Sequence, residues 1–278
     1  AANNSPAVIK AQADYVATGA SDEDTINTAL TAAGAGGTVF LAEGTFIVDG
    51  TILIPNNVTL AGGGSGTIIE LADIDITDNV IENSDTVTGT GIVIRDLMIN
   101  GRKDLNTAGT QNGIYLSGMG AGDGRQGAIV TGVSVQNTRS KGIQLFNSQY
   151  NSITNNYVNA AGDTGIVIGG SRNKVINNSL ISNDGYGIAF TDSFLNVVSG
   201  NQINSNILGG MFFSNAGNNT VTGNSYIDTG GAVGTNGIVI TNSDDNLITG
   251  NSFVDSTCST TCYAINITDA LSDRTYLS

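Results

Sequence analysis

The chain has 278 residues, a formal net charge of −14 and only 12% charged residues, about half the proportion usual in soluble domains. This charge would repel phosphate backbones and anionic lipid, and no run of about 18 apolar residues occurs. We therefore expect neither a nucleic-acid partner nor membrane insertion. The absence of histidine excludes histidine-metal sites and histidine-based catalysis.

Residues 1–37 are predicted to form an N-terminal cap. Ser21 can N-cap a helix whose first turn, Asp22–Asp24, is acidic, and Gly34 can end that helix. The apolar face of the helix would consist of Ile26, Ala29, Leu30 and Ala33.

Residues 38–71 then indicate five short strands, because apolar side chains alternate between turn-forming residues. We expect the strands at Thr38–Leu41, Thr45–Val48, Thr51–Ile54, Val58–Leu60 and Thr67–Leu71. The chain is accordingly interpreted as one domain, 1–278, in which a cap segment (1–37) precedes the coils (38–278).

Two motifs recur in a single phase along the rest of the chain. The first, Gly-Ile-x-apolar, occurs at Gly91–Ile94, Gly113–Leu116, Gly142–Leu145, Gly165–Ile168, Gly187–Phe190 and Gly237–Ile240. The second begins and ends with asparagine, at Asn151–Asn156, Asn173–Asn178, Asn196–Asn201, Asn219–Asn224 and Asn246–Asn251. Most copies of the first motif are 22 or 23 residues apart.

A repeat of about 22 residues accommodates roughly three short strands and their turns, which is one coil of a parallel β-helix. A single coil cannot bury its apolar face, so coils would stack about 4.8 Å apart around a shared core. Glycine, asparagine and aspartate would occupy bends that need positive φ. Asparagines at equivalent places in successive coils would hydrogen-bond along the stack.

Three N-terminal segments carry a family resemblance. Asp14–Leu30, Gly36–Phe46 and Leu60–Gly64 resemble the entry segment of the right-handed parallel β-helix superfamily. That superfamily includes pectate-lyase-like enzymes, alginate epimerases, phage tailspikes and surface proteins. The resemblance implies an all-β, right-handed parallel β-helix of ~22-residue coils with a short N-terminal capping α-helix. It does not specify a function.

Other features favour an extracellular or cell-surface protein from which a signal peptide has been removed. Cys258 and Cys262 favour a small-loop disulfide, with two free thiols as the alternative. Glycosylation sequons begin at four asparagines: Asn57, Asn177, Asn218 and Asn266.

Several residue groups are candidates for binding. Cations between residues 95 and 174 suggest a shallow groove for an acidic glycan, although ordinary outward-facing strand residues would give the same pattern. The groove candidates are Arg139, Lys141, Arg172, Lys174 and Tyr186. Asp163 and Asp184, with Asp192 nearby, could form a carboxylate pair of the kind that glycosidases use.

Metal and catalytic assignments are sparse. Oxygen ligands alternate along Asp73–Asn79, which suggests calcium, but a half-exposed strand explains the pattern equally well. The active-site segment of the alginate epimerases is not matched near Tyr186. We assign no catalytic residue and no cofactor.

Two classes of function follow. The favoured one is a structural or assembly protein, such as a surface-layer, sheath, fibre or adhesin subunit, whose rigid solenoid self-associates. The alternative is a polysaccharide-active enzyme (lyase, epimerase or phage depolymerase) or a non-catalytic glycan-binding protein. Self-association and extracellular polysaccharide are accordingly the expected partners.

Overall fold

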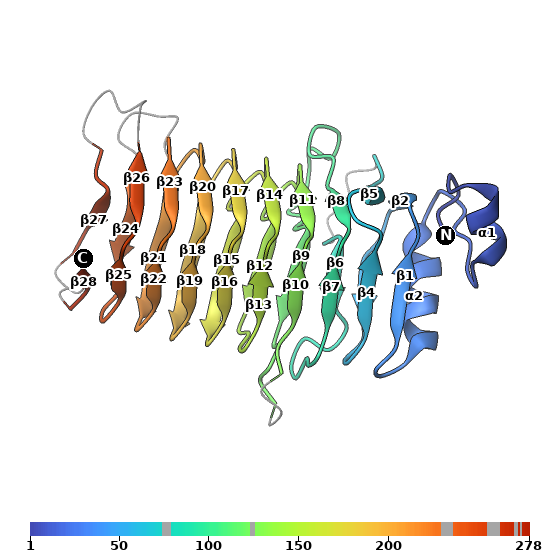
Figure 1. The fold of residues 1–278 in the computed structure, drawn as a ribbon, viewed down its shortest axis with the longest axis horizontal. Coiled ribbons are helices and arrows are strands. Elements are labelled where there is room, and N and C mark those ends of the chain that lie inside the picture. Colours follow the sequence, from blue (N-terminus) through green and yellow to red (C-terminus); the bar gives the residue numbers. More distant parts are fainter. Residues whose placement is uncertain (74–78, 123–125, 229–235, 255–261, 270–271, 273) are drawn as a thin grey trace.

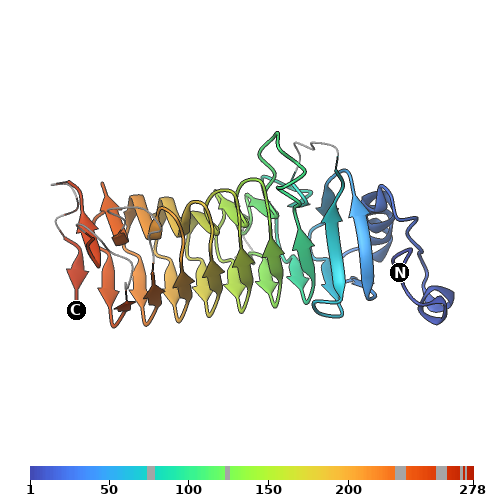
Figure 2. The same ribbon diagram turned by 90° about the horizontal axis from the view of Figure 1, so that it is seen from above.

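The protein is a right-handed parallel β-helix, as the sequence predicts. In the computed structural model, three parallel sheets of 10, 9 and 9 strands form the walls of a rod. The N-terminal helices lie at one end of the rod and the C-terminus at the other (Figure 1 and Figure 2). The structure describes residues 1–73, 79–122, 126–228, 236–254, 262–269, 272 and 274–278.

Each coil contributes one strand to each sheet, in the order A, B, C. Sheet A contains β1 (Thr38–Leu41), β4 (Thr59–Gly62), β7 (Val93–Arg95), β10 (Ile129–Thr131), β13 (Ser152–Thr154), β16 (Lys174–Ile176), β19 (Val197–Ser199), β22 (Thr220–Thr222), β25 (Leu247–Thr249) and β28 (Tyr276–Leu277). Sheet B contains β2 (Gly44–Val48), β5 (Thr67–Leu71), β8 (Met98–Asn100), β11 (Ser134–Gln136), β14 (Tyr157–Asn159), β17 (Ser179–Ile181), β20 (Gln202–Asn204), β23 (Ser225–Ile227) and β26 (Ser252–Val254). Sheet C contains β3 (Ile52–Ile54), β6 (Ile81–Asn83), β9 (Ile114–Ser117), β12 (Ile143–Phe146), β15 (Ile166–Ser171), β18 (Tyr186–Phe194), β21 (Gly209–Gly217), β24 (Asn236–Thr241) and β27 (Ile265–Ile267).

The pairing register reproduces the sequence period. Ile143 pairs with Ile166 and Ile166 with Ile188, so these coils contain 23 and 22 residues. The inward-facing members of each strand are isoleucine, leucine, valine and phenylalanine, and they form one continuous buried core. Outward-facing residues are mostly polar, which accounts for the low charge and the high serine, threonine and asparagine content.

The predicted asparagine ladder is confirmed: it runs along two corners of the rod, and a further pair, in which Asn183 donates to Asn206 at 2.7 Å, lies at the third corner. At the corner between sheets A and B, the side-chain amide of Asn156 donates to Oδ1 of Asn178 at 3.0 Å, and Asn178 donates likewise to Asn201 at 3.0 Å. Each Oδ1 also accepts the backbone N–H of the asparagine in the preceding coil, as Asn201 does from Asn178 at 2.9 Å. The ladder asparagines are Asn156, Asn178, Asn201, Asn224 and Asn251 at this corner, and Asn151, Asn173, Asn196, Asn219 and Asn246 between sheets C and A.

The residue before each asparagine at the A–B corner explains the Asn-Asn and Gly-Asn pairs in the repeat. These residues adopt positive φ, from 56° at Asn155 to 65° at Gly200. Glycine adopts that region readily, and asparagine does so with less strain than most other residues. The prediction that such residues mark the bends is therefore correct at this corner.

Gly91 of the Gly-Ile motif has the positive φ that the prediction expects, whereas Gly142, Gly165 and Gly187 have a different role. A Cβ added to Gly142 would lie 2.7 Å from the carbonyl oxygen of Gly165 and 2.3 Å from Cγ1 of Val158. Gly165 and Gly187 meet the carbonyl of the next repeat glycine in the same way. These positions require glycine because backbones and core side chains approach closely, and none of the three has positive φ.

Two helices lie within the predicted cap. Helix α2 (Asp22–Ala33) begins after Ser21 as expected, and Ile26 and Leu30 are buried against the first coil. A short additional helix, α1 (Ala7–Gln12), was not predicted.

Ser21 occupies the N-cap position of α2, but the prediction that its side chain caps the helix is wrong. Ser21 adopts a left-handed conformation, makes no capping hydrogen bond, and donates its hydroxyl to Asp49 instead.

Two acidic residues of α2 accept hydrogen bonds from the first coil, in addition to their favourable place at the helix N-terminus. Asp22 accepts the backbone N–H of Ile47 at 2.9 Å, and Glu23 accepts that of Asp49 at 3.0 Å. Two further contacts of this type are Asn4 with the N–H of Thr45 and Asn27 with the N–H of Leu53. The cap thereby satisfies outward backbone donors along the first coil, where no preceding strand exists.

Replacing a central ladder asparagine should destabilise the fold. In Asn201→Ala, the N–H groups of Asn178 and the carbonyl of Val175 lose buried partners, which costs on the order of 1–3 kcal/mol or more. Asn204→Ala on the outer face of the same coil should change the free energy of unfolding by less than about 0.5 kcal/mol. Urea unfolding of both variants measures the difference, and equal losses would contradict a structural role for the ladder.

Glu23→Gln should make the cap less sensitive to pH. Burial raises the pKa of Glu23, and a hydrogen bond with Asp49 raises it further. The stability contributed by Glu23 is therefore complete below its unfolded pKa of about 4.3 and is lost as pH rises through the folded pKa. The glutamine amide cannot ionise, so the variant should gain stability relative to the parent chain between about pH 4 and pH 7.

The Glu23–Asp49 contact and the hydroxyl of Ser21 lower the pKa of Asp49. The stability contributed by Asp49 is therefore lost only as pH falls through this lowered pKa.

The matched control for Glu23→Gln is Asp24→Asn, which removes an exposed charge from the same helical turn. Urea midpoints that change in parallel with pH for the parent chain and Glu23→Gln would contradict this assignment.

Candidate functional site

The outer face of sheet C carries two stacked aromatic pairs. Register aligns the outward residues Tyr115, Gln144, Val167, Ala189 and Phe212 on five consecutive strands. Strand alternation alone explains this alignment, because every second residue of each paired strand faces solvent. We call these five residues, together with Phe146 and Tyr186, the sheet C face.

Two aromatic pairs lie on the sheet C face. The rings of Tyr186 and Phe212 stack with centroids 5.1 Å apart, and those of Tyr115 and Phe146 lie 6.4 Å apart. Partly exposed stacked rings offer an apolar surface on the outside of the sheet. Such a surface suits the apolar side of a sugar ring.

Ion pairs line the adjoining corner, where sheet B leads into sheet C. Lys141 contacts Asp163 at 3.1 Å, and Lys103 contacts Asp184 at 3.1 Å. Lys103 belongs to residues 101–113, a longer connection that rises beside β8 (Figure 1). This loop brings Lys103 to a carboxylate 81 residues further along the chain.

A cleft of about 580 Å³ opens at this corner. Its lining is entirely polar or charged and consists of Glu70, Asn100, Arg102, Lys103, Asp104, Asn137, Arg139 and Asp184. Side chains within it are held by hydrogen bonds, such as the 2.8 Å pair between Arg102 and Glu70 and the 3.0 Å bond from Asn100 to Glu70. We call it the polar cleft.

Arg139 differs from the other cations around the polar cleft. Arg102, Lys103 and Lys141 are each paired with a carboxylate. The exposed Arg139 side chain, by contrast, makes no ion pair or hydrogen bond with any part of the chain that the structure describes. Its guanidinium is therefore available to a negatively charged group.

The structure separates the residues predicted for a glycan groove into two groups. Arg139, Lys141 and Tyr186 lie at the B–C corner or beside it. Arg172 lies at the opposite C–A corner, 5.8 Å above the ring of Tyr150, and Lys174 begins β16 in sheet A.

The predicted carboxylates divide in the same way. Asp163 and Asp184 occupy adjacent coils, and the N–H of Gly185 donates to the carbonyl of Asp163 at 2.9 Å. Asp192 does not join them, because it lies near the far end of β18 and accepts a hydrogen bond from Asn215. The two neighbouring carboxylates are half-exposed and held by lysines, which is unlike the apolar pocket of a glycosidase acid.

Sequence reasoning did not select Glu70, Asn100 or Phe212 as site residues. Each is unremarkable in its own repeat, and only the pairing register brings it beside the candidates. The signal that could have found Phe212 is its place in the Gly-Met-Phe-Phe variant of the repeat, in phase with Ala189.

The remaining sequence predictions stay predictions. Cys258 lies outside the described residues, as do residues 74–78 of the calcium candidate. The sequon asparagines Asn57, Asn177 and Asn218 are exposed at turns with positive φ, and Asn266 is half-buried on β27.

Soft metal ligands are scattered through the described residues. Met119 and Met211 are fully buried in the core of different coils, and Met98 is on sheet B. Within the described ranges, no three cysteine, aspartate or glutamate residues come together in a way that could hold a metal ion. No described helix is long and apolar enough to cross a membrane.

Solved structures share the fold at low sequence identity. Tailspike protein 2 of Escherichia coli O157:H7 bacteriophage CAB120 aligns with a TM-score of 0.67 and 17% identity over 95% of this chain and 41% of its own. A DFA-IIIase of Arthrobacter chlorophenolicus A6 aligns with 0.56 and 15% over 85% and 65%. The mannuronan C-5 epimerase AlgE6 A-module of Azotobacter vinelandii aligns with 0.55 and 16% over 95% and 97%.

These likenesses establish the fold, and the chain spans less than half the length of the tailspike. No curated protein matches the sequence. A family match covers residues 78–269, which is most of the coil region. On that match, the chain belongs to the NosD family, described as "Periplasmic copper-binding protein (NosD)".

Proposed function

We propose that the protein binds an extracytoplasmic polysaccharide along the sheet C face, with an acidic group of the saccharide at Arg139. The observation that carries the proposal is the unpaired Arg139 in an entirely polar cleft, whose lining residue Asp184 is two residues before Tyr186 of the stacked Tyr186–Phe212 pair. The aromatic rings would support sugar rings, and the cleft would exchange hydrogen bonds with hydroxyl groups.

Local charge at the B–C corner supports an acidic ligand there. A net charge of −14 opposes polyanions over most of the surface. The B–C corner gathers Arg102, Lys103, Arg139 and Lys141, of which three are already neutralised. We therefore expect a carboxylate or sulfate of the ligand to contact the guanidinium of Arg139, the one cation of the four without a carboxylate partner among the described residues.

The comparisons are compatible with this proposal without specifying it. The neighbours include a tailspike, an epimerase named for mannuronan and an enzyme named for DFA-III. The family description places its members in the periplasm, which fits a location outside the cytoplasm. We propose binding and not a particular reaction, because Asp163 and Asp184 are each held in an ion pair.

Copper, which the family description names, does not fit the described residues. Copper sites use histidine, cysteine thiolate or methionine. This chain has no histidine, and its methionines are divided between the buried core and sheet B. We therefore assign copper no role in the proposed function.

Arg139→Ala should weaken binding of an acidic polysaccharide about tenfold, because a charge-assisted bidentate contact is lost. Binding of a neutral polysaccharide should change less than about twofold. Titration calorimetry with polymannuronate and with a neutral mannan, each on the parent chain and the variant, measures both effects.

Arg95→Ala is the matched control, since it removes one exposed arginine from sheet A. It should leave both affinities unchanged apart from a small screened effect of net charge. Equal loss in Arg95→Ala and Arg139→Ala would show that only net charge matters. Absence of binding to any acidic or neutral glycan would overturn the proposal.

Self-assembly, the function favoured by the sequence, remains a second candidate. Exposed apolar side chains follow the C–A corner: Phe146 and Phe194 are each 46% exposed, and Leu195 is 48% exposed. Leu195 also adopts a φ of 61°, a strained conformation for a bulky residue. Exposed apolar side chains on a rigid corner would suit lateral contacts between rods of a sheath or fibre.

The double variant Phe194→Ser/Leu195→Ser should abolish concentration-dependent association if this corner is the contact. Leu53→Ser, which changes an exposed apolar residue at the capped end, should associate as the parent chain does. Sedimentation velocity over about a hundredfold range of concentration tests this. A parent chain that stays monomeric throughout would contradict the assembly candidate and leave glycan binding unaffected.

A further inference from the structure

The cap treats the three sheets of the first coil unequally. Asn4 and Asp22 accept outward backbone N–H groups of β2, Glu23 accepts the N–H of Asp49, and Asn27 accepts that of Leu53 in β3. These contacts block further pairing at the first edges of sheets B and C. Strand β1, the first strand of sheet A, receives no equivalent contact from the described residues.

The orientation of the β1 backbone follows from its pairing with β4. The carbonyl of Gly37 accepts the N–H of Thr59 at 3.0 Å, so alternation turns the N–H and C=O groups of Thr38 and Phe40 away from β4. Neither residue has a backbone hydrogen-bond partner on that side within the described part of the chain. The edge therefore offers two donors and two acceptors spaced for one additional strand.

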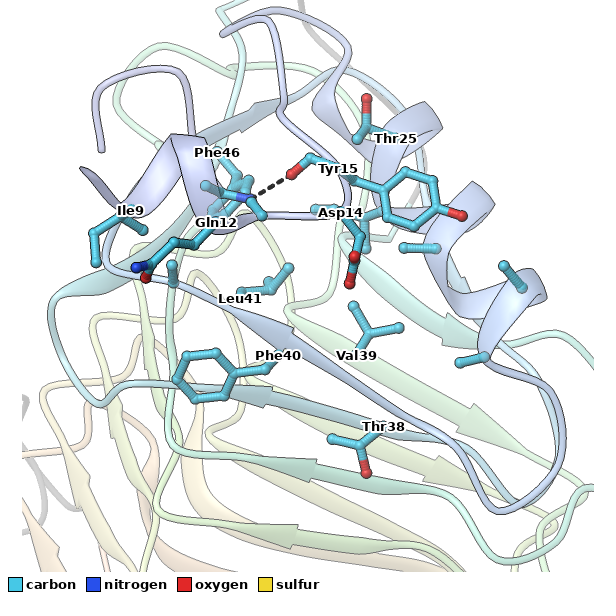
Figure 3. A pocket seen from close by; sticks show the side chains of 17 residues that line it. Ile9, Gln12, Asp14, Tyr15, Thr25, Thr38, Val39, Phe40, Leu41 and Phe46 are labelled. Atoms are coloured by element: carbon cyan, nitrogen blue, oxygen red, sulfur yellow. Dashed lines mark hydrogen bonds between the residues drawn. The ribbon is translucent and has the colours of Figure 1, made fainter. Parts of the chain in front are cut away.

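A cavity of about 850 Å³ lies against this edge. It opens between α1, α2 and β1, and Figure 3 shows Val39, Phe40 and Leu41 below it and Tyr15 and Asp14 above it. Apolar residues and polar groups both line it, and Phe40 is 61% exposed. Asp14 is the one charged side chain among the described lining residues.

We propose that the edge of β1 accepts an extended peptide segment of a partner protein, which adds a strand to sheet A. The four residues of β1 match a segment of about four residues at about 3.3 Å each. Alternate side chains of the segment would enter the cavity and contact Val39 and Leu41, and the others would face Phe40 and solvent.

Charge selects the occupant. The carboxylate of Asp14 lines the cavity, where the amino group of Ala1 donates to the carbonyl of Tyr15, and the whole chain carries −14. A second copy of this chain would bring the same excess negative charge, whereas a basic segment is attracted. The occupant is therefore a segment that alternates apolar and basic residues.

The test uses a fluorescein-labelled hexapeptide of alternating valine and lysine and the intact protein. Fluorescence anisotropy should show saturable binding, and a hexapeptide of alternating valine and glutamate should bind at least tenfold more weakly. N-methylation of the three amides in one register should abolish binding, while methylation of the three in the other register should change it less than about threefold. This register dependence distinguishes strand pairing from simple charge attraction and requires no change to the protein.

Variants of β1 provide the second arm. Thr38→Pro removes one outward N–H at a strand start, where proline is tolerated, and should weaken binding about tenfold, whereas Thr38→Val should not. Equal binding of the lysine and glutamate peptides, equal effects of the two methylation registers, or no saturable binding would overturn the proposal. Self-association of the parent chain that Thr38→Pro abolishes would also overturn it, by assigning the edge to a second copy.

Discussion

The fold depends on how its buried turns satisfy their own backbone. A corner enclosed by neighbouring coils leaves N–H and C=O groups that water cannot reach, and each needs a partner. Here one side-chain amide supplies both functions, because Asn178 donates to the carbonyl of Ile153 while its Oδ1 accepts from Asn156. The asparagine side chain fixes the register of neighbouring coils as strictly as strand pairing does. A shift of one residue would leave buried backbone groups of both coils without partners.

This fixed phase also creates the surface on which a ligand could bind. Once the corners are in phase, outward residues of successive strands align whether or not they are close in sequence. Tyr186 pairs with Gly209 and Phe212 with Ala189, and the two rings stack diagonally because the ring of Tyr186 lies over the side-chain-free Gly209. The polar cleft needs one more element, the connection 101–113, which places Lys103 beside Asp184. A regular scaffold and one irregular loop together form the candidate site.

The sequence predicts the scaffold far better than the site, for a physical reason. Strand alternation and ladder asparagines repeat with every coil, so each copy supports the same interpretation. A residue that occurs only once has no second copy to support its interpretation. Ser21, for example, looks like a helix cap, yet its hydroxyl contacts Asp49. Gly142 looks like a bend, yet it provides clearance for Val158. Likewise, Arg139 and Arg172 appear similar in sequence, and only the route of each coil assigns them to opposite corners.

The ladder geometry has a further consequence for how this molecule can change. The two ladder asparagines are five positions apart in every coil that has both, from Asn151 and Asn156 to Asn246 and Asn251. Additional residues enter elsewhere, as in the coils of 27 residues between Met211 and Ile265. Because lengthening a surface loop costs little entropy, the connection from sheet B to sheet C can lengthen in coils that lack buried asparagines there, unlike the coils of Asn183 and Asn206. The rod is thus a natural host for grafted loops, provided that the span between the two ladders keeps its length.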